Sequence, residues 1–303
     1  MIPSIYPGYR QLLASGELEA RVLHAEAHLA ACDLCPRRCG VDRAGGATGV
    51  CRGGRRAILA SYGPHFGEEA PLVGEHGSGT IFLAGCNLKC AFCQNYEISH
   101  EVEGEEVSAG ELASAMLSLA ETGCHNINFV TPTHFAPQIL EGVLLAARKG
   151  LEIPIVYNCG GYESIDMLRL LDGVVDIYMP DFKFWTEASS RRYLAAPDYP
   201  EAARAAIREM HRQVGDLVVR RGIAERGLLV RHLVMPGGLD ETEAILRFLA
   251  EEISPETFVN VMNQYRPCYR ANEFTEIARR LAAAEHKRAL EIASQAGLTR
   301  VCS

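Results

Sequence analysis

Residues 85–95 read Gly-Cys-Asn-Leu-Lys-Cys-Ala-Phe-Cys-Gln-Asn, and their three cysteines follow the spacing C-x3-C-x2-C. A [4Fe–4S] cluster ordinarily takes four cysteine ligands, so Cys86, Cys90 and Cys93 are one thiolate short. Three ligands leave one iron open, as a catalytic zinc site keeps one position open for its substrate. The pattern therefore favours a catalytic iron–sulfur cluster over three buried or zinc-binding cysteines.

The composition bounds the class of protein. The 303 residues are 48% hydrophobic and 22% charged, which suits one large domain or two smaller ones. With a net charge of −8 and no basic tract, we expect no nucleic-acid partner. No apolar run is long enough for a membrane span, and residues 1–20 lack the apolar centre of a signal peptide. Eleven cysteines then indicate metal binding in the cytoplasm rather than disulfides.

Two regions follow from the pattern of residues. Residues 1–75 are rich in Gly, Arg and Cys after a first helix over 16–29, whereas residues 76–303 alternate strand and helix signals. Strands are predicted over 80–84, 126–130, 154–157, 174–179, 228–234 and 258–262. Helices are predicted over 108–123, 137–149, 164–171, 201–214, 242–252 and 273–296, the first with a capping box of Ser108 and Glu111. This alternation predicts a parallel α/β fold, either a partial barrel or an open doubly wound sheet.

Polar motifs follow the predicted strands, at the edge where parallel α/β folds collect their chemistry. They include Thr131-Pro132-Thr133-His134, Asn158 with two glycines, Met179-Pro180-Asp181-Phe182-Lys183, and Asn263 to Cys268. Asp181 and Lys183 share one side of an extended chain, so they could bind a zwitterionic ligand or pair with each other. Arg231 lies within the fifth strand, and it could hold a carboxylate if it points inward.

The cysteine loop and its position after a strand resemble the radical SAM superfamily. This resemblance implies a partial (βα)6 barrel with a Cys-rich N-terminal extension. It also implies that S-adenosylmethionine (SAM) occupies the open iron. The motifs over 78–270 are most similar to the glycyl-radical-enzyme activases, related to the pyruvate formate-lyase activating enzyme. Further segments, such as His65 to Glu69 and Gly77 to Phe82, resemble an uncharacterised activase-like subgroup.

The resemblance assigns SAM contacts residue by residue. It implies roles for Asn158, Met179, Asp181 and Lys183. Arg231 joins them if its side chain points into the barrel. The chain departs from the family in three places. Asn158 replaces an aspartate, which leaves a monovalent cation near SAM undecided. Thr131, Pro132 and Thr133 replace a glycine-rich run whose backbone holds the SAM amino group, and Arg266 replaces a histidine. Arginine cannot act as a base, although it still donates hydrogen bonds.

A second group of cysteines precedes the barrel. Cys32, Cys35, Cys39 and Cys51 follow the spacing C-x2-C-x3-C-x11-C. Four thiolates within twenty residues can close a zinc site or supply every ligand of a second iron–sulfur cluster. The spacing does not distinguish a zinc site from an iron–sulfur cluster. A role in electron relay would require this site to lie close to the first cluster.

Together these features predict a radical SAM enzyme. The resemblance implies that a reduced cluster cleaves SAM to a 5′-deoxyadenosyl radical, which abstracts hydrogen from a substrate. It implies an electron donor such as flavodoxin or ferredoxin. The substrate could be the glycine of a partner enzyme, a peptide or a small molecule. The alternative is a non-catalytic iron–sulfur or zinc protein that acts as a scaffold or electron relay, with no affinity for SAM.

Overall fold

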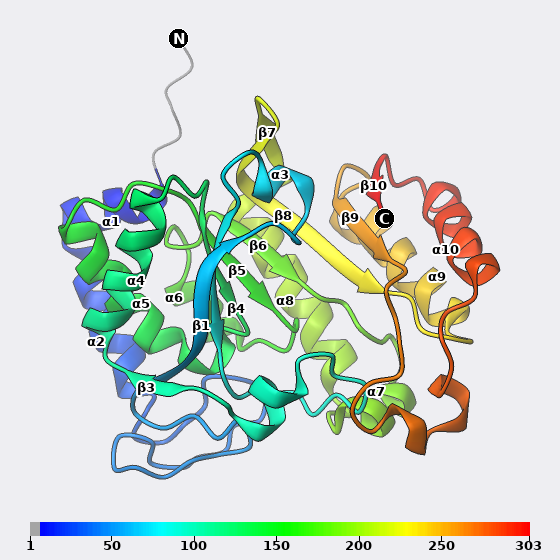
Figure 1. The fold of residues 1–303 in the computed structure, drawn as a ribbon, viewed down its shortest axis with the longest axis horizontal. Coiled ribbons are helices and arrows are strands. Elements are labelled where there is room, and N and C mark those ends of the chain that lie inside the picture. The colour runs from blue at the N-terminus through cyan, green and yellow to red at the C-terminus, as the bar shows by residue number, and fades with distance from the viewer. Residues whose placement is uncertain (1–6) are drawn as a thin grey trace.

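A computed structural model describes residues 7–303, and its centre is a ten-stranded sheet (Figure 1). Residues 1–6, part of the segment judged to lack a signal peptide, lie outside the described range. Six parallel strands form the middle of the sheet: β2 (Ser78–Leu83), β4 (Ile127–Val130), β5 (Ile155–Cys159), β6 (Ile177–Pro180), β8 (Ile223–Leu233) and β9 (Phe258–Met262). These are the six strands that the sequence predicts, with shifted ends.

The parallel strands lie side by side in the order in which the chain forms them. A doubly wound sheet would reverse this order at a switch point, and no reversal occurs among β2, β4, β5, β6, β8 and β9. The sheet curves, and its concave face opens between β1 (Ala57–His65) and β9 (Figure 1). The predicted α/β partial barrel is thus confirmed, and the open doubly wound alternative is wrong.

Four further strands extend the sheet, and the sequence analysis predicted none of them. β1 runs antiparallel to β2, and β3 (Glu105–Val107) pairs with β1. β10 (Arg300–Cys302) adds a parallel strand to β9, and β7 (Val218–Arg220) forms a hairpin with β8. The hairpin loop has φ values of 52° at Arg221 and 83° at Gly222, as a two-residue type I′ turn requires.

Helices connect the strands and cover the convex face of the sheet (Figure 1). The predicted capping box is present, since Glu111 N–H donates to Ser108 Oγ at 3.2 Å and Ser108 N–H donates to the Glu111 carboxylate at 2.7 Å. The α-helices are α1 (Gly8–Ser15), α2 (Glu17–Ala27), α3 (Ala70–Val73), α4 (Ala109–Glu121), α5 (Ala136–Arg148), α6 (Ile165–Leu170), α7 (Glu187–Leu194), α8 (Tyr199–Val214), α9 (Leu239–Phe248) and α10 (Ala283–Gln295). Short 3-10 turns span Thr133–Phe135, Ala271–Glu273 and Thr275–Ile277, and π turns span Glu97–Glu101 and Leu249–Ile253.

The last predicted helix, over 273–296, is wrong in its first third. Short 3-10 turns replace it until α10 begins at Ala283. Glu276 in this stretch accepts hydrogen bonds from Arg192 at 2.7 Å and Tyr193 at 2.6 Å, both on α7. These contacts with a distant helix fix a non-helical path, and a local pattern of apolar residues carries no information about them.

The interior of the barrel is closed at the amino ends of the strands. Leu72 on α3 is fully buried and packs with Val156, Ile177 and Leu229, which line the concave face. Its carbonyl accepts a hydrogen bond from Asn126, the residue that precedes β4, at 2.8 Å. The short helix therefore fills the amino end, and the carboxyl ends of the strands remain for a functional site.

The proposed boundary between residues 1–75 and 76–303 stays a prediction. β1, in the first region, shares a sheet with β2 in the second, and α2 packs on α5. Within residues 7–303, none of the helices combines the length and apolar character that a membrane span needs.

Asp176 joins α1 to the start of two strands. Its carboxylate lies just before β6 and accepts the backbone N–H of Gly8 at 3.1 Å and of Ile155 at 2.9 Å. Burial raises the pKa of this carboxyl to about 7, although the two N–H donors counteract the rise. The folded protein therefore favours the protonated form more strongly than the unfolded chain does.

We expect this group to weaken the fold as pH rises. Between about pH 4 and pH 7 the unfolded chain loses the Asp176 proton first, so the free energy of unfolding falls by up to about 4 kcal/mol. Asp176→Asn should remove this contribution to the pH dependence of the free energy of unfolding, as measured by urea unfolding from pH 4 to pH 8. Glu163, whose pKa burial also raises to about 7, should retain its own share. Asp166→Asn, at an exposed carboxyl, is the matched control, and an equal effect of both variants would contradict the assignment.

Candidate functional site

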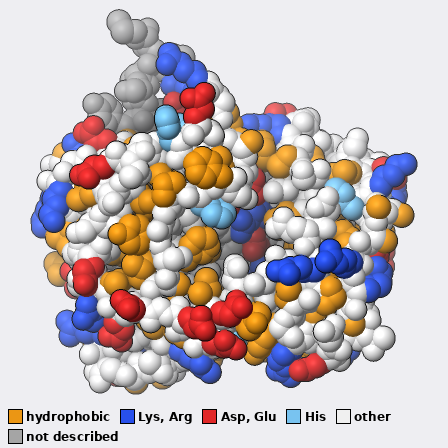
Figure 2. Space-filling model, viewed as in Figure 1, with side chains coloured by type: hydrophobic (Ala, Val, Ile, Leu, Met, Phe, Trp, Pro, Cys, Tyr) orange, Lys and Arg blue, Asp and Glu red, His pale blue; other side chains and the backbone are white. Residues whose placement is uncertain are grey.

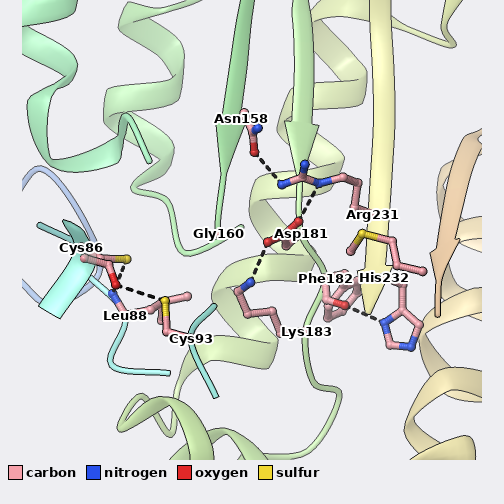
Figure 3. Close-up of polar contacts among 12 residues, drawn as sticks. Cys86, Leu88, Cys93, Asn158, Gly160, Asp181, Phe182, Lys183, Arg231 and His232 are labelled. Atoms are coloured by element: carbon pink, nitrogen blue, oxygen red, sulfur yellow. Dashed lines mark hydrogen bonds and ion pairs between the residues drawn. The ribbon is translucent and has the colours of Figure 1, made fainter. Parts of the chain in front are cut away.

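The three cysteines of residues 85–95 lie on the loop that follows β2. Cys90 is buried, and Cys86 and Cys93 are partly buried. Leu88 N–H donates to Cys86 Sγ at 3.4 Å, and Cys93 Sγ lies 3.1 Å from Ser99 Oγ (Figure 3). Phe92 is buried against Phe184 and Tyr265, which fixes the loop from its apolar side.

Burial and the nearby positive charge act in opposite directions on the thiols of the loop. Burial raises the pKa of Cys86 to about 11 and raises that of Cys90 further, and the neighbouring thiolates add to both shifts. Lys183 opposes the shift at both positions, so it lies where it would stabilise negatively charged sulfur. Within residues 7–303, no three His, Cys, Asp or Glu side chains are arranged around a single metal ion. A [4Fe–4S] cluster has no such need, because each cysteine binds a different iron.

A network of charged side chains lies at the carboxyl ends of β5, β6 and β8 (Figure 3). Arg231 donates to Asp181 at 2.8 Å and to Asn158 at 2.6 Å, and Lys183 donates to the second Asp181 oxygen at 2.6 Å. Arg231 also contacts the carboxylate of Glu68 at 3.4 Å. Arg231 thus points inward, and Asp181 and Lys183 pair with each other.

The network holds its charges in a largely buried place. Burial would raise the pKa of Asp181, yet Arg231 and Lys183 hold it below its ordinary value. Burial does raise the pKa of Glu68, and Arg231 offsets only part of that rise. Two cations and one firmly ionised carboxylate therefore face the concave side of the sheet. Figure 2 shows a hollow near the middle of this face, with basic and acidic side chains deep inside it.

Other predicted site residues are placed differently. Met179 is fully buried in the apolar interior below Asp181, and Arg266 is exposed on the segment after β9. Thr131 and Pro132 follow β4, and Thr131 has a φ of 59° that is unusual for a β-branched residue. The Thr133 hydroxyl donates to the buried carboxylate of Glu163 at 2.7 Å.

Two histidines near these motifs have structural partners. His134 is buried with Nε2 2.9 Å from the carbonyl of Ala84, and burial lowers its pKa to about 3. His232 lies on the convex side, between the carbonyl of Phe182 and the hydroxyl of Thr242 on α9. Neighbouring groups therefore hold both rings in place, and His232 leaves the inward side of β8 to Arg231.

Sequence reasoning missed Glu163 and Lys89. Glu163 is fully buried after β5, and it accepts hydrogen bonds from Thr133 and, at 3.1 Å, from Tyr157. Its position four residues beyond Cys159, just after a strand end, was a usable signal. Lys89 lies inside the cysteine loop, and burial lowers its pKa, whereas the thiolate of Cys86 counteracts this shift.

Comparison with known proteins gives a family and a fold. The family model of the radical SAM superfamily matches residues 80–249. The chain is 34% identical over 276 residues to the uncharacterized protein MJ0674 of Methanocaldococcus jannaschii, covering 88% of this chain and 75% of that protein.

Two solved structures are also similar. The methylornithine synthase PylB is 14% identical with a TM-score of 0.46, over 73% of this chain and 70% of that one. SuiB of Streptococcus suis, in complex with its precursor peptide SuiA, is 12% identical with a TM-score of 0.47, over 69% of this chain. The present chain spans 43% of SuiB.

Replacement of Arg231 should show how much this network contributes to the free energy of unfolding. In Arg231→Met, Glu68 loses its cationic partner and Asp181 keeps only Lys183, so the free energy of unfolding should fall by about 3–5 kcal/mol. Adding Glu68→Gln to this variant should recover part of the loss, as measured by urea unfolding. Arg288→Met removes an exposed pair on α10 and should cost less than about 1 kcal/mol. Equal losses in Arg231→Met and Arg288→Met would contradict this account.

Proposed function

The chain belongs to the radical SAM superfamily, and we propose that Cys86, Cys90 and Cys93 bind the [4Fe–4S] cluster that membership implies. When bound, the cluster and SAM supply the reductive cleavage that yields methionine and a 5′-deoxyadenosyl radical. The observation that carries the proposal is the position of Lys183. Lys183 donates to Asp181 at 2.6 Å, and a Cβ at Gly160 would lie 3.8 Å from Lys183 Cε and 2.9 Å from Leu88 of the cysteine loop, so the loop adjoins the charged network.

The chain's own residues would bind and orient SAM. Asp181 would attract the amino group, while Arg231 and Lys183 would attract the carboxylate. Asn158 would keep Arg231 in place through the hydrogen bond that it accepts. The backbone of Thr131 to Thr133 lies at the end of the neighbouring strand and would border the same ligand.

Met179 and Arg266 would take lesser parts in SAM binding. Met179 is buried in the apolar interior beneath Asp181, so it would support the binding residues from below. Arg266 is exposed, so its contact would require the segment after β9 to fold over the ligand.

The substrate would enter beside Lys183. A cavity of about 610 Å³ extends from Lys183 to α7 and α9, with Phe184, Met235 and Glu241 among its lining residues. This space accommodates a small molecule or a short peptide segment. We propose an activase-like enzyme in which the hydrogen donor is a peptide glycine, a free peptide or a small molecule, and in which reduced flavodoxin or ferredoxin supplies the electron. We also propose a second metal centre at Cys32, Cys35, Cys39 and Cys51.

Single replacement of Cys86, Cys90 or Cys93 by Ala should reduce SAM cleavage to background, because each thiolate binds one iron of the cluster. The measurement is 5′-deoxyadenosine formed under anaerobic conditions with dithionite, after reconstitution with iron and sulfide. Cys124→Ala, at a buried cysteine outside both groups, is the control and should keep its cleavage. Full cleavage in Cys90→Ala would overturn the assignment, and so would an absence of SAM binding and cleavage in the unmodified protein.

A further inference from the structure

The four N-terminal cysteines converge although they lie in a segment without helix or strand between α2 and β1. Cys32, Cys35, Cys39 and Cys51 line one small cavity. Backbone hydrogen bonds shape the loop, since Cys32 N–H donates to Val41 O at 3.0 Å. Three of the thiols are buried, and that of Cys39 is partly exposed.

Buried positive charge faces this cavity. Arg43 is fully buried, and within residues 7–303 it forms no ion pair with a carboxylate. Its guanidinium donates to the carbonyls of Gly54, at 2.8 and 3.1 Å, and of His134, at 2.7 Å, and lies 3.9 Å from Cys32 Sγ. A fully buried arginine is rarely without a counter-charge. Four metal-bound thiolates would supply that charge.

Small residues let the chain pass close to the thiols and to the arginine. A Cβ at Gly49 would lie 2.9 Å from Cys39 Sγ, and a Cβ at Gly53 would lie 2.9 Å from the Arg43 guanidinium. Gly53 N–H donates to Cys51 Sγ at 3.4 Å, in the way that backbone donors stabilise cluster thiolates.

The two cysteine groups are neighbours. Gly85, which precedes Cys86, lies so close to Cys51 that an added Cβ would be within 2.4 Å of its carbonyl oxygen. Asn87 lines the N-terminal cavity and also lies beside Cys86, with 4.0 Å between its Oδ1 and the Cys86 sulfur. An electron that passes between the two groups would therefore cross only the adjoining backbone segments at Cys51 and Gly85.

We propose that Cys32, Cys35, Cys39 and Cys51 bind a second [4Fe–4S] cluster that passes single electrons to the cluster at Cys86, Cys90 and Cys93. This inference rests on the proposed function of the first site. A low-potential one-electron donor, flavodoxin or ferredoxin, is oxidised as the second cluster is reduced from the 2+ to the 1+ state. The second cluster returns to 2+ as it reduces the first cluster from 2+ to 1+. No atoms move in either step.

Metal content tests the second cluster independently of activity. After anaerobic reconstitution the unmodified protein should contain about eight iron atoms per chain. The triple variant Cys86→Ala/Cys90→Ala/Cys93→Ala should keep about four, with a matching amount of acid-labile sulfide. One zinc and no iron in the triple variant would overturn the second cluster. If the unmodified protein contained eight irons and did not cleave SAM, this would instead overturn the proposed function of the first site.

Electron delivery tests the relay. In Cys39→Ala/Cys51→Ala, SAM cleavage driven by reduced flavodoxin should fall much further than cleavage driven by dithionite, which reduces the first cluster directly. An unchanged ratio of the two rates would overturn the relay. If this variant fails to fold, electron paramagnetic resonance of the fully reduced unmodified protein decides. Magnetic coupling between neighbouring clusters should broaden the spectrum, the triple variant should lose that broadening, and two uncoupled signals would refute the relay.

Discussion

The common direction and order of the six parallel strands is the constraint on which the site depends. Because each strand lies beside the next along the chain, their carboxyl ends form one continuous rim. The register then sets partners, with Asp181 opposite Arg231 and Arg231 opposite Asn260. A shift of one residue in β8 would turn Arg231 to the convex side, where His232 now contacts α9.

The sequence predicts what depends on neighbouring residues. The capping box at Ser108 and the six central strands follow from spacing or alternation, whereas the sequence left the orientation of Arg231 open until its contact with Asp181 was seen. The missed features depend on contacts between distant segments. The edge strands need a partner strand, Glu163 needs the hydroxyl of Thr133, and the stretch around Glu276 needs α7. Cysteine spacing predicts two metal sites, but only the fold shows that the two cysteine groups adjoin.

That closeness follows from the path of the chain. The N-terminal loop leads directly into β1, which pairs with β2, and β2 leads directly into the second cysteine loop. Pairing of these two strands therefore brings Cys51 and Gly85 to the same end of the sheet. The Cys-rich segment is joined to the barrel edge rather than attached to it by a free linker.

The plug formed by α3 has a kinetic consequence. Because Leu72 fills one end of the barrel, the ligands and products of the proposed reaction would enter and leave through the opposite end. A large protein substrate seated over that end would trap methionine and 5′-deoxyadenosine beneath it. In the proposed enzyme SAM would then bind first, and its fragments would leave only after the larger molecule, so turnover would be strictly ordered.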